Sequence, residues 1–376
     1  MKTLKIIFYI LCLIILIAVL AFGSLAIFVD PNKLKPMLVE EVRKQTGYKL
    51  VIDGKLSWSF YPRVAVKIDR MTLTPPNQTV PFIDAQDVRI GADVAQLIHS
   101  NEKLQGNVSI SNVKLTNIHA ENVSADLHWQ NNALIIEPIK ASFYGGTLVG
   151  TATGSNFSAV QHWKWNIQAN GIQIKPLLDD ANDGNSKIKI AGVGQMNMQA
   201  ESSGKTREQV LNSLNGTLTF SIRDGVVEGI DLNYLFQSAD ALINKQPMPS
   251  PTNINETVFQ SLQGTAAIKN GVAETNDMLL TSSAFTTKAQ GSVELLSQSI
   301  NLRLQLNPQQ KAKTQWEIPV LITGRLNHPD IRLDTEEIQK FLAAQEIEKL
   351  KAKAVEQIQK RIPGKAGEFL QNLLGN

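Results

Sequence analysis

The residues that could carry out catalysis are few and scattered in this chain. Five histidines lack the spacing of metal ligands: His99, His119, His128, His162 and His328. His119, Asp126 and His128 come closest to a cluster, but His119 and His128 are an odd number of residues apart, so on one continuous strand they would face opposite ways. Hydrolysis or group transfer requires an activated nucleophile, an acid–base partner or a metal, and no GxSxG, HExxH, Walker or GxGxxG pattern is present. We therefore expect no catalytic site, no metal site and no cofactor, with histidines that hydrogen-bond or face solvent.

Apolar residues, by contrast, recur in a regular pattern. The stretch 66–74 (VKIDRMTLT) matches 108–116 (VSISNVKLT) position for position: apolar residues alternate twice, skip one extra residue and alternate twice again. A slip of one residue turns a strand's side chains to the opposite face. Keeping one apolar face therefore requires a bulge or bend at Asp69 and Arg70, and again at Ser111 and Asn112. The recurrence indicates a duplicated β unit, although a chance match between alternating strands is the alternative.

These apolar residues are the candidate binding surface. A twisted antiparallel sheet with one apolar face must cover that face with a second layer or offer it to something apolar. Few helices are predicted, and bulges at matched positions would curl the sheet so that its apolar face lines a trough. Acyl chains entering such a trough gain about 0.8 kcal/mol per buried CH₂ relative to water. The candidate lining residues are Val64, Val66, Ile68, Met71, Leu73, Val108, Ile110, Val113 and Leu115. The alternative is that they fill an ordinary closed sandwich core.

The elements predicted around these residues are many strands and a few helices. A helix is predicted at 32–45, where apolar residues fall at i, i+3, i+4 and i+8, with Gly47 at its C-cap. A short helix is expected at 93–99, and the polar stretch 178–186 is the best candidate for a hinge or long loop. Strands are predicted from period-two alternation at 49–53, 63–74, 81–92, 108–116, 123–130, 133–140, 143–153, 163–169 and 188–200.

A second half begins near residue 201. A helix is predicted at 206–214, followed by a hairpin that turns at Asp224 and Gly225, and Asp231 is expected to cap a helix that runs to Ile243. Strands are predicted at 257–269, 272–280, 286–295, 300–306, 318–325 and 331–333. A long amphipathic helix follows at 334–361, with Asp334 and Glu337 as a capping box. Its basic residues would favour an anionic bilayer surface; the plainer alternative is a helix packed on the end of the sheet.

The start of the chain carries an uncharged apolar run at 6–29. As a helix it extends roughly 36 Å, enough to cross the hydrocarbon core of a bilayer. A cleaved signal peptide is the alternative, but secretory apolar cores are only about 7–15 residues long. We therefore expect an uncleaved anchor. The short N-terminal tail favours an N-in orientation with the bulk of the chain across the membrane.

Composition excludes several classes of protein. The chain has 376 residues and a net charge of +3, which is too modest to indicate nucleic-acid binding, and no zinc-finger pattern or long basic run supports it. The single cysteine, Cys12, lies inside the apolar run. It rules out intrachain disulfides and paired-cysteine metal sites.

Three segments resemble the AsmA family of bacterial envelope proteins. Residues 28–62 (FVDPNKLKPMLVEEVRKQTGYKLVIDGKLSWSFYP) are similar to that family's N-terminal signature, and residues 214–236 (LNGTLTFSIRDGVVEGIDLNYLF) to the signature of its C-terminal module. The ending at 318–334 (IPVLITGRLNHPDIRLD) is similar to the family's closing strands. These segments lie near both ends of the chain in the order expected for the family.

The resemblance implies a mainly β fold with peripheral helices: an N-terminal transmembrane helix, an elongated, curled antiparallel sheet that forms a repeating β-groove, and a C-terminal amphipathic helix. The expected divisions are an anchor at 1–30, an N-terminal groove region at 31–200, a C-terminal β module at 201–333 and the terminal helix at 334–376. The implied protein is a single-pass inner-membrane protein, N-in with its bulk in the periplasm. It would bind or conduct membrane phospholipid for outer-membrane biogenesis, with outer-membrane biogenesis proteins as further partners. The alternative is a scaffold or assembly factor for outer-membrane proteins that carries no lipid. This chain departs from the longer members of the family in having a short middle.

Overall fold

The computed structural model describes residues 30–59, 65–76, 78–92, 103–156, 160–204, 206–250, 255–308 and 317–361. Its helices are η1 (Pro31–Leu34), α2 (Lys35–Thr46), α4 (Ile174–Ala181), α5 (Arg207–Asn212), α6 (Leu232–Ile243) and α7 (Thr335–Arg361). Its strands are β1 (Lys49–Asp53), β2 (Ser57–Ser59), β3 (Ala65–Thr74), β4 (Ile83–Ala92), β5 (Lys103–Leu115), β6 (Ile118–Gln130), β7 (Ala133–Phe143), β8 (Gly146–Ser155), β9 (His162–Gln173), β10 (Lys189–Ser203), β11 (Asn215–Glu228), β12 (Glu256–Lys269), β13 (Val272–Thr281), β14 (Phe285–Glu294), β15 (Ser299–Pro308), β16 (Ile318–Arg325) and β17 (His328–Leu333).

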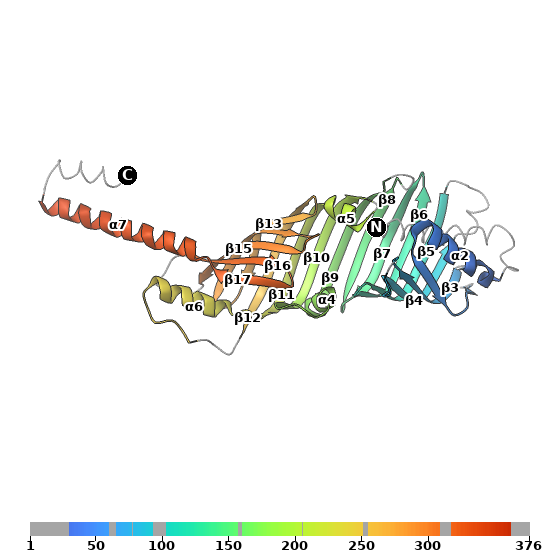
Figure 1. Cartoon of the computed structure of the whole chain (residues 1–376), viewed down its shortest axis with the longest axis horizontal. Helices are drawn as coiled ribbons and strands as arrows, with labels where there is room; N and C mark the ends of the chain where they lie inside the picture. The colour runs from blue at the N-terminus through green and yellow to red at the C-terminus, as the bar shows by residue number, and fades with distance from the viewer. Residues whose placement is uncertain are drawn as a thin grey trace.

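The described strands form one 17-stranded sheet. From β3 to β17 each strand pairs antiparallel with the next along the chain, while β1 and β2 both pair with β3. Figure 1 shows an elongated body in which this meander runs from β3 at one end to β17 at the other. The expectation of a mainly β, antiparallel fold with few helices is confirmed, and the sheet is not closed.

Two-residue turns join many of these strands. Asn131 and Asn132 connect β6 to β7 with φ of 52° and 58°, and Asn270 and Gly271 connect β12 to β13 with φ of 49° and 79°. Positive φ at both central residues matches the twist of a hairpin, and Asn and Gly tolerate it. The strands predicted at 123–130 and 133–140, and at 257–269 and 272–280, leave these two residue pairs between them, so both turns follow from the sequence.

The hairpin predicted at Asp224 and Gly225 is wrong. Asp224 does adopt a positive φ of 50°, but β11 continues through it from Asn215 to Glu228 and the residue is skipped in the pairing with β12. A Cβ at position 225 would clash with the ring of Phe259 and the carbonyl of Ala191. The Asp-Gly pair therefore serves a bulge and a close packing contact inside a strand, where the same residue types are also favoured.

The predicted interruptions are present in both copies of the repeat. Ile68 and Met71 are both buried although three residues apart, and the two residues between them are exposed. The ladder passes from the pair Ile68–Val88 to the pair Arg70–Gln86 without pairing Asp69, and it skips Ser111 in the same way between β4 and β5. Strand β4 lies between the two copies and pairs with equivalent positions of both. Val66, Ile90 and Val108 therefore lie side by side on one face.

The helix predicted at 32–45 is confirmed as η1 followed by α2, and Gly47 ends it with a φ of 75°. The hinge expected at 178–186 is partly wrong, because α4 occupies Ile174–Ala181. Its Pro176 obscured the helix in the sequence, yet proline is tolerated in the first turn. The expected helix at 93–99 lies outside the described residues.

The C-terminal half of the sheet curls back on itself. The backbone N–H of Lys187, just before β10, donates to the carbonyl of Asn327 in the β16–β17 turn at 2.9 Å. These residues are 140 positions apart in the chain, so the last strands return to the start of β10. Figure 1 shows α7 extending beyond this end of the body. In its first turn the N–H of Glu337 donates to Asp334 at 3.1 Å, which confirms Asp334 as the cap.

Helix α7 packs on the sheet only through its start. Ile338 is 1% exposed, whereas Ile347 and Leu350 are 56% and 66% exposed. The expectation of a helix packed along the end of the sheet therefore holds for its first two turns only. No helix in the described ranges has the length and apolar character to cross a bilayer. The anchor predicted at 6–29 lies outside those ranges.

Candidate functional site

One face of the sheet is apolar from β3 to β17. Residues directly opposite each other in an antiparallel pair point to the same side, so the register carries the orientation from strand to strand. In the middle of the sheet, Met198 of β10 is opposite Ile167 of β9 and Leu218 of β11. The same side continues through Leu262 of β12 and Met278 of β13 toward β17. We call this side the apolar face.

A small buried core of Leu127, Leu134, Ala152 and Trp163 interrupts the middle of the apolar face, but many of the other side chains there are half-buried. They extend over the strands from β6 to β11, and they are Val123, Ile136, Ile139, Leu148, Trp165, Ile167, Met196, Met198, Leu218, Phe220 and Ile222. A closed sandwich would bury such residues. The half-buried state leaves apolar surface available along the centre of the sheet.

The opposite side of the same strands is polar. Asn197 of β10 is opposite Gln168 of β9 and Thr219 of β11, and all three side chains are exposed. Each is the immediate neighbour of an apolar-face residue, so the contrast follows the period of two along each strand. The sheet is therefore amphipathic, with one side solvated.

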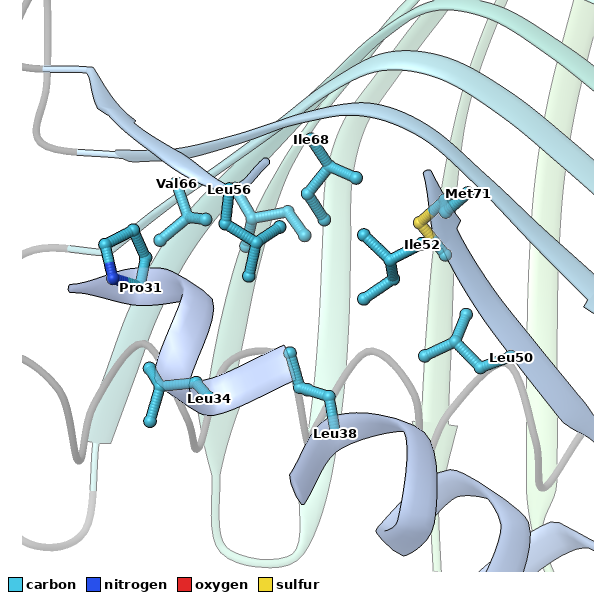
Figure 2. A pocket seen from close by; sticks show the side chains of 10 residues that line it. Pro31, Leu34, Leu38, Leu50, Ile52, Leu56, Val66, Ile68 and Met71 are labelled. Atoms are coloured by element: carbon cyan, nitrogen blue, oxygen red, sulfur yellow. The ribbon is translucent and has the colours of Figure 1, made fainter. Parts of the chain in front are cut away.

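Helix α2 and η1 cover the apolar face at its N-terminal end. Leu38 and Val42 of α2 pack against Leu50, Ile68 and Leu73, and all five are buried. Figure 2 shows Leu34 and Leu38 of the helices facing side chains of β1 and β3 around a small apolar cavity. The cavity has a volume of about 30 Å³, room for about two water molecules. This end of the apolar face is therefore filled by the chain's own side chains.

The structure divides the predicted lining residues into two groups. Ile68, Met71 and Leu73 of the first copy are buried under the helix, and Val66 is partly buried beside them. In the second copy Val108, Ile110 and Val113 are partly buried at the margin of this core, and Leu115 is 41% exposed. Val64 lies outside the described residues. The repeat thus marks the covered end of the apolar face and the beginning of its open part.

Sequence reasoning missed the central residues of the apolar face because it followed only the repeated motif. The alternation that marks them is visible, for example, in residues 195–200 (QMNMQA), where the two methionines and Ala200 lie on the apolar face. Strand alternation alone does not say which strands lie under a helix. The register and burial supply that information.

Helix α6 covers the C-terminal end of the apolar face. Its Leu232 and Ala239 are buried in a core with Phe259, Phe285 and Leu306. As predicted, Asp231 caps the helix, accepting a hydrogen bond from the N–H of Tyr234 at 2.9 Å. Both ends of the face are thus roofed by short amphipathic helices, and most of the large apolar side chains between them are half-buried.

Two polar clusters in the described part of the chain contain catalytic residue types: one joins His162, Ser203 and Glu201 on β9 and β10, and the other surrounds Asp180 of α4. His119 Nδ1 lies 2.7 Å from Asp180 Oδ2, and the hydroxyl of Tyr144 donates to the same oxygen at 2.6 Å. Burial, with the hydrogen bond to Asp180, raises the pKa of Tyr144 to about 12. Burial opposes ionisation of Asp180, but hydrogen bonds from Tyr144 and His119 keep the pKa of its carboxyl below the usual value.

The cluster around Asp180 ties three segments together: the start of β6, the β7–β8 turn and α4. No hydrogen bond to a serine, threonine or cysteine hydroxyl or thiol accompanies it among the described residues. The expectation that His119 and His128 face opposite ways is wrong, since Asn122 between them has a φ of 50° and shifts the alternation. Both histidines lie on the polar side of β6. No group of three or more metal-ligating side chains occurs in the described ranges.

Comparisons with known proteins fit this architecture. The family model described as "AsmA family" matches residues 1–106 and 95–278. The chain is similar to Protein AsmA of Escherichia coli (strain K12), with 36% identity over 87 residues. This overlap covers 23% of the chain and 14% of that protein, so the chain matches a small part of the relative's length. No solved structure matches it significantly.

Proposed function

The chain belongs to the AsmA family, and from this membership and the apolar face we propose that it binds or conducts phospholipid along that face. The observation that carries the proposal is the row of half-buried apolar side chains from β6 to β11 between two roofed ends. In this proposal the apolar face is the lining of a β-groove, and the acyl chains of the lipid provide the missing second layer.

The energetics suit transfer rather than storage. An acyl chain moving from water onto the apolar face gains about 0.8 kcal/mol per buried CH₂. Relative to a bilayer the gain is near zero, because the bilayer buries the same groups. A continuous apolar path therefore lowers the barrier to moving a lipid without trapping it.

The half-buried part of the apolar face is comparable in length to the hydrocarbon core of a bilayer. With neighbouring strands about 4.8 Å apart, the pairings from β6 to β11 extend over roughly 24 Å, against about 30 Å for the hydrocarbon core. We place the protein in the bacterial inner membrane, anchored by residues 6–29 with its bulk in the periplasm, acting in outer-membrane biogenesis. We propose no enzymatic role and no nucleic-acid partner.

The test is the lipid content of the purified full chain. Native mass spectrometry in detergent should detect bound phospholipid, and a photoactivatable residue at position 167 or 198 should crosslink to it. Crosslinks from the polar side, at position 168 or 197, should be absent. A chain free of lipid, or one crosslinked equally from both sides, would contradict the proposal.

A scaffold for outer-membrane protein assembly is the second candidate function. It is favoured by α7, which extends beyond the sheet with Ile347 and Leu350 exposed. Exposed apolar side chains on a projecting helix fit a protein partner. A crosslink from position 347 or 350 to a protein, together with the absence of bound lipid, would favour the scaffold.

A further inference from the structure

A second hollow opens at the C-terminal end of the sheet, where the curled strands meet. Four parts of the chain line it: the residues before β10, the β11–α6 connection with the start of α6, Asn255 before β12, and β17. Its volume is about 460 Å³, within the range of small-molecule sites, about 300–1,000 Å³. One of the lining residues is Lys187, whose backbone N–H donates to the carbonyl of Asn327.

The inner wall of this hollow is part of the apolar core. Ile230, Leu235 and Ile331 line the hollow, and the same three residues pack against the core beneath α6. The hollow is therefore a polar-rimmed opening whose base is continuous with the covered end of the apolar face.

The rim carries charges of both signs. Lys187 is exposed, and among the described residues no carboxylate lies within ion-pair distance of its ammonium group. Nearby lysines differ: Lys175 pairs with Glu228 at 3.2 Å, and Lys189 with Asp179 at 3.8 Å. Asp231 and Asp330 belong to the same rim. The carboxylate of Asp330 lies 3.6 Å from Nε of Arg332, and that of Asp231 accepts the capping hydrogen bond of α6.

The N-terminus of α6 does not provide a further anion site. The N–H of Leu232 donates to the hydroxyl of Thr257 at 3.0 Å, and that of Tyr234 donates to Asp231. Lys187 is therefore the cation on the rim that would bind a phosphate. The two carboxylates would repel a purely anionic headgroup and attract an amine.

From this arrangement we propose that the hollow is a headgroup site for a zwitterionic phospholipid, with its phosphate on Lys187, its amine toward Asp231 and Asp330, and its acyl chains leaving along the apolar wall of Ile230, Leu235 and Ile331. This inference rests on the proposed function and specifies its ligand. It adds a headgroup class that the apolar face alone does not distinguish.

The test is a competition between two headgroups. The full chain is exposed to mixed micelles that contain phosphatidylethanolamine and phosphatidylglycerol with the same acyl chains in equal amounts, and native mass spectrometry counts the bound lipids of each class. Wild type should be enriched in phosphatidylethanolamine. Replacing both carboxylates (Asp231→Asn with Asp330→Asn) should move the ratio toward phosphatidylglycerol by about threefold, the size of a surface charge interaction.

The variants separate charge from folding. Asparagine at position 231 preserves the helix cap, so α6 should stay folded. Lys187→Glu should lower binding of both lipids, whereas Lys288→Glu, at an exposed lysine on β14 outside the hollow, should change neither.

The outcomes also separate the two proposals. Normal total lipid with equal classes, or a ratio that the double variant does not move, overturns the headgroup site and leaves lipid binding intact. A wild-type preference for phosphatidylglycerol overturns it as well. A complete absence of lipid overturns both.

Discussion

Placing charge at the centre of the apolar face should abolish lipid binding. Ile167 and Met198 are directly opposite each other on β9 and β10, so their Cβ atoms are about 5 Å apart. The double variant Ile167→Asp with Met198→Asp puts two carboxylates across the path that an acyl chain would follow. Neither residue is in a closed core, since both are half-buried.

The expected loss of binding free energy follows from the length of acyl chain that no longer contacts the apolar face. A tail crossing two strands runs along about 10 Å of sheet, roughly eight methylene groups. At about 0.8 kcal/mol per fully buried CH₂, and with only one side of the tail on the sheet, the loss is about 3 kcal/mol. That corresponds to about a 100-fold weaker association.

The cost to folding should be smaller than for a core substitution. Full burial of such a side chain contributes about 1.5–3 kcal/mol, and half-buried residues contribute proportionally less. The matched control is Gln168→Asp with Asn197→Asp, the adjacent pair on the polar side of the same strands. It adds the same charges to the same strands and should leave lipid binding unchanged.

Bound phospholipid per chain, measured by native mass spectrometry and by extraction, is the readout, with circular dichroism as the check on folding. The reasoning would be refuted if the double variant at 167 and 198 retained lipid. It would also be refuted if the control variant at 168 and 197 lost lipid to the same extent.

Four further outcomes concern stability. Leu73→Ala should lower the free energy of unfolding by about 2–5 kcal/mol because Leu73 is fully buried under α2, while Leu115→Ala, at an exposed site, should change it by less than about 0.5 kcal/mol; urea denaturation measures both. Asp231→Ala should weaken α6 by about 1 kcal/mol and Asp231→Asn should not, as seen in hydrogen exchange of α6 amides; equal protection would contradict the capping role. Because the pKa of Tyr144 is raised from 10.0 to about 12 in the folded chain, its stabilising contribution is complete below pH 10 and is lost between pH 10 and pH 12; in Tyr144→Phe this loss should disappear from the pH dependence of unfolding. The pKa of Asp180 is lowered, so its contribution is present above the ordinary carboxyl pKa and is lost as the pH falls through the folded value.

The sequence by itself determined the elements and their class. Period-two alternation located most of the strands, the paired asparagines at 131 and 132 located a hairpin turn, and Asp231 and Asp334 located two helix starts. These signals are local, since a turn, a cap or an alternation depends on neighbours within a few residues. The interruption at Asp69 was predictable for the same reason: Ile68 and Met71 can share a face only if the strand is irregular between them.

Local signals failed where one residue type serves two structures. The Asp224–Gly225 pair is equally suited to a hairpin turn and to a bulge, and only the contact with Phe259 shows that β11 continues. Pro176 reads as a helix breaker, but its place in the first turn of α4 makes it compatible with a helix.

The tertiary structure alone decided which apolar residues are covered. Ile68 and Ile167 are both inward-facing β-branched residues, and nothing in their own strands distinguishes them. Ile68 is buried because α2, more than twenty residues away in the chain, lies over it, and Ile167 is half-buried at the open centre of the sheet. Whether a strand residue is buried depends on which other elements pack against its strand. Long-range packing, and not the local sequence pattern, therefore decides where the open path lies and where the hollow forms as β17 returns to β10.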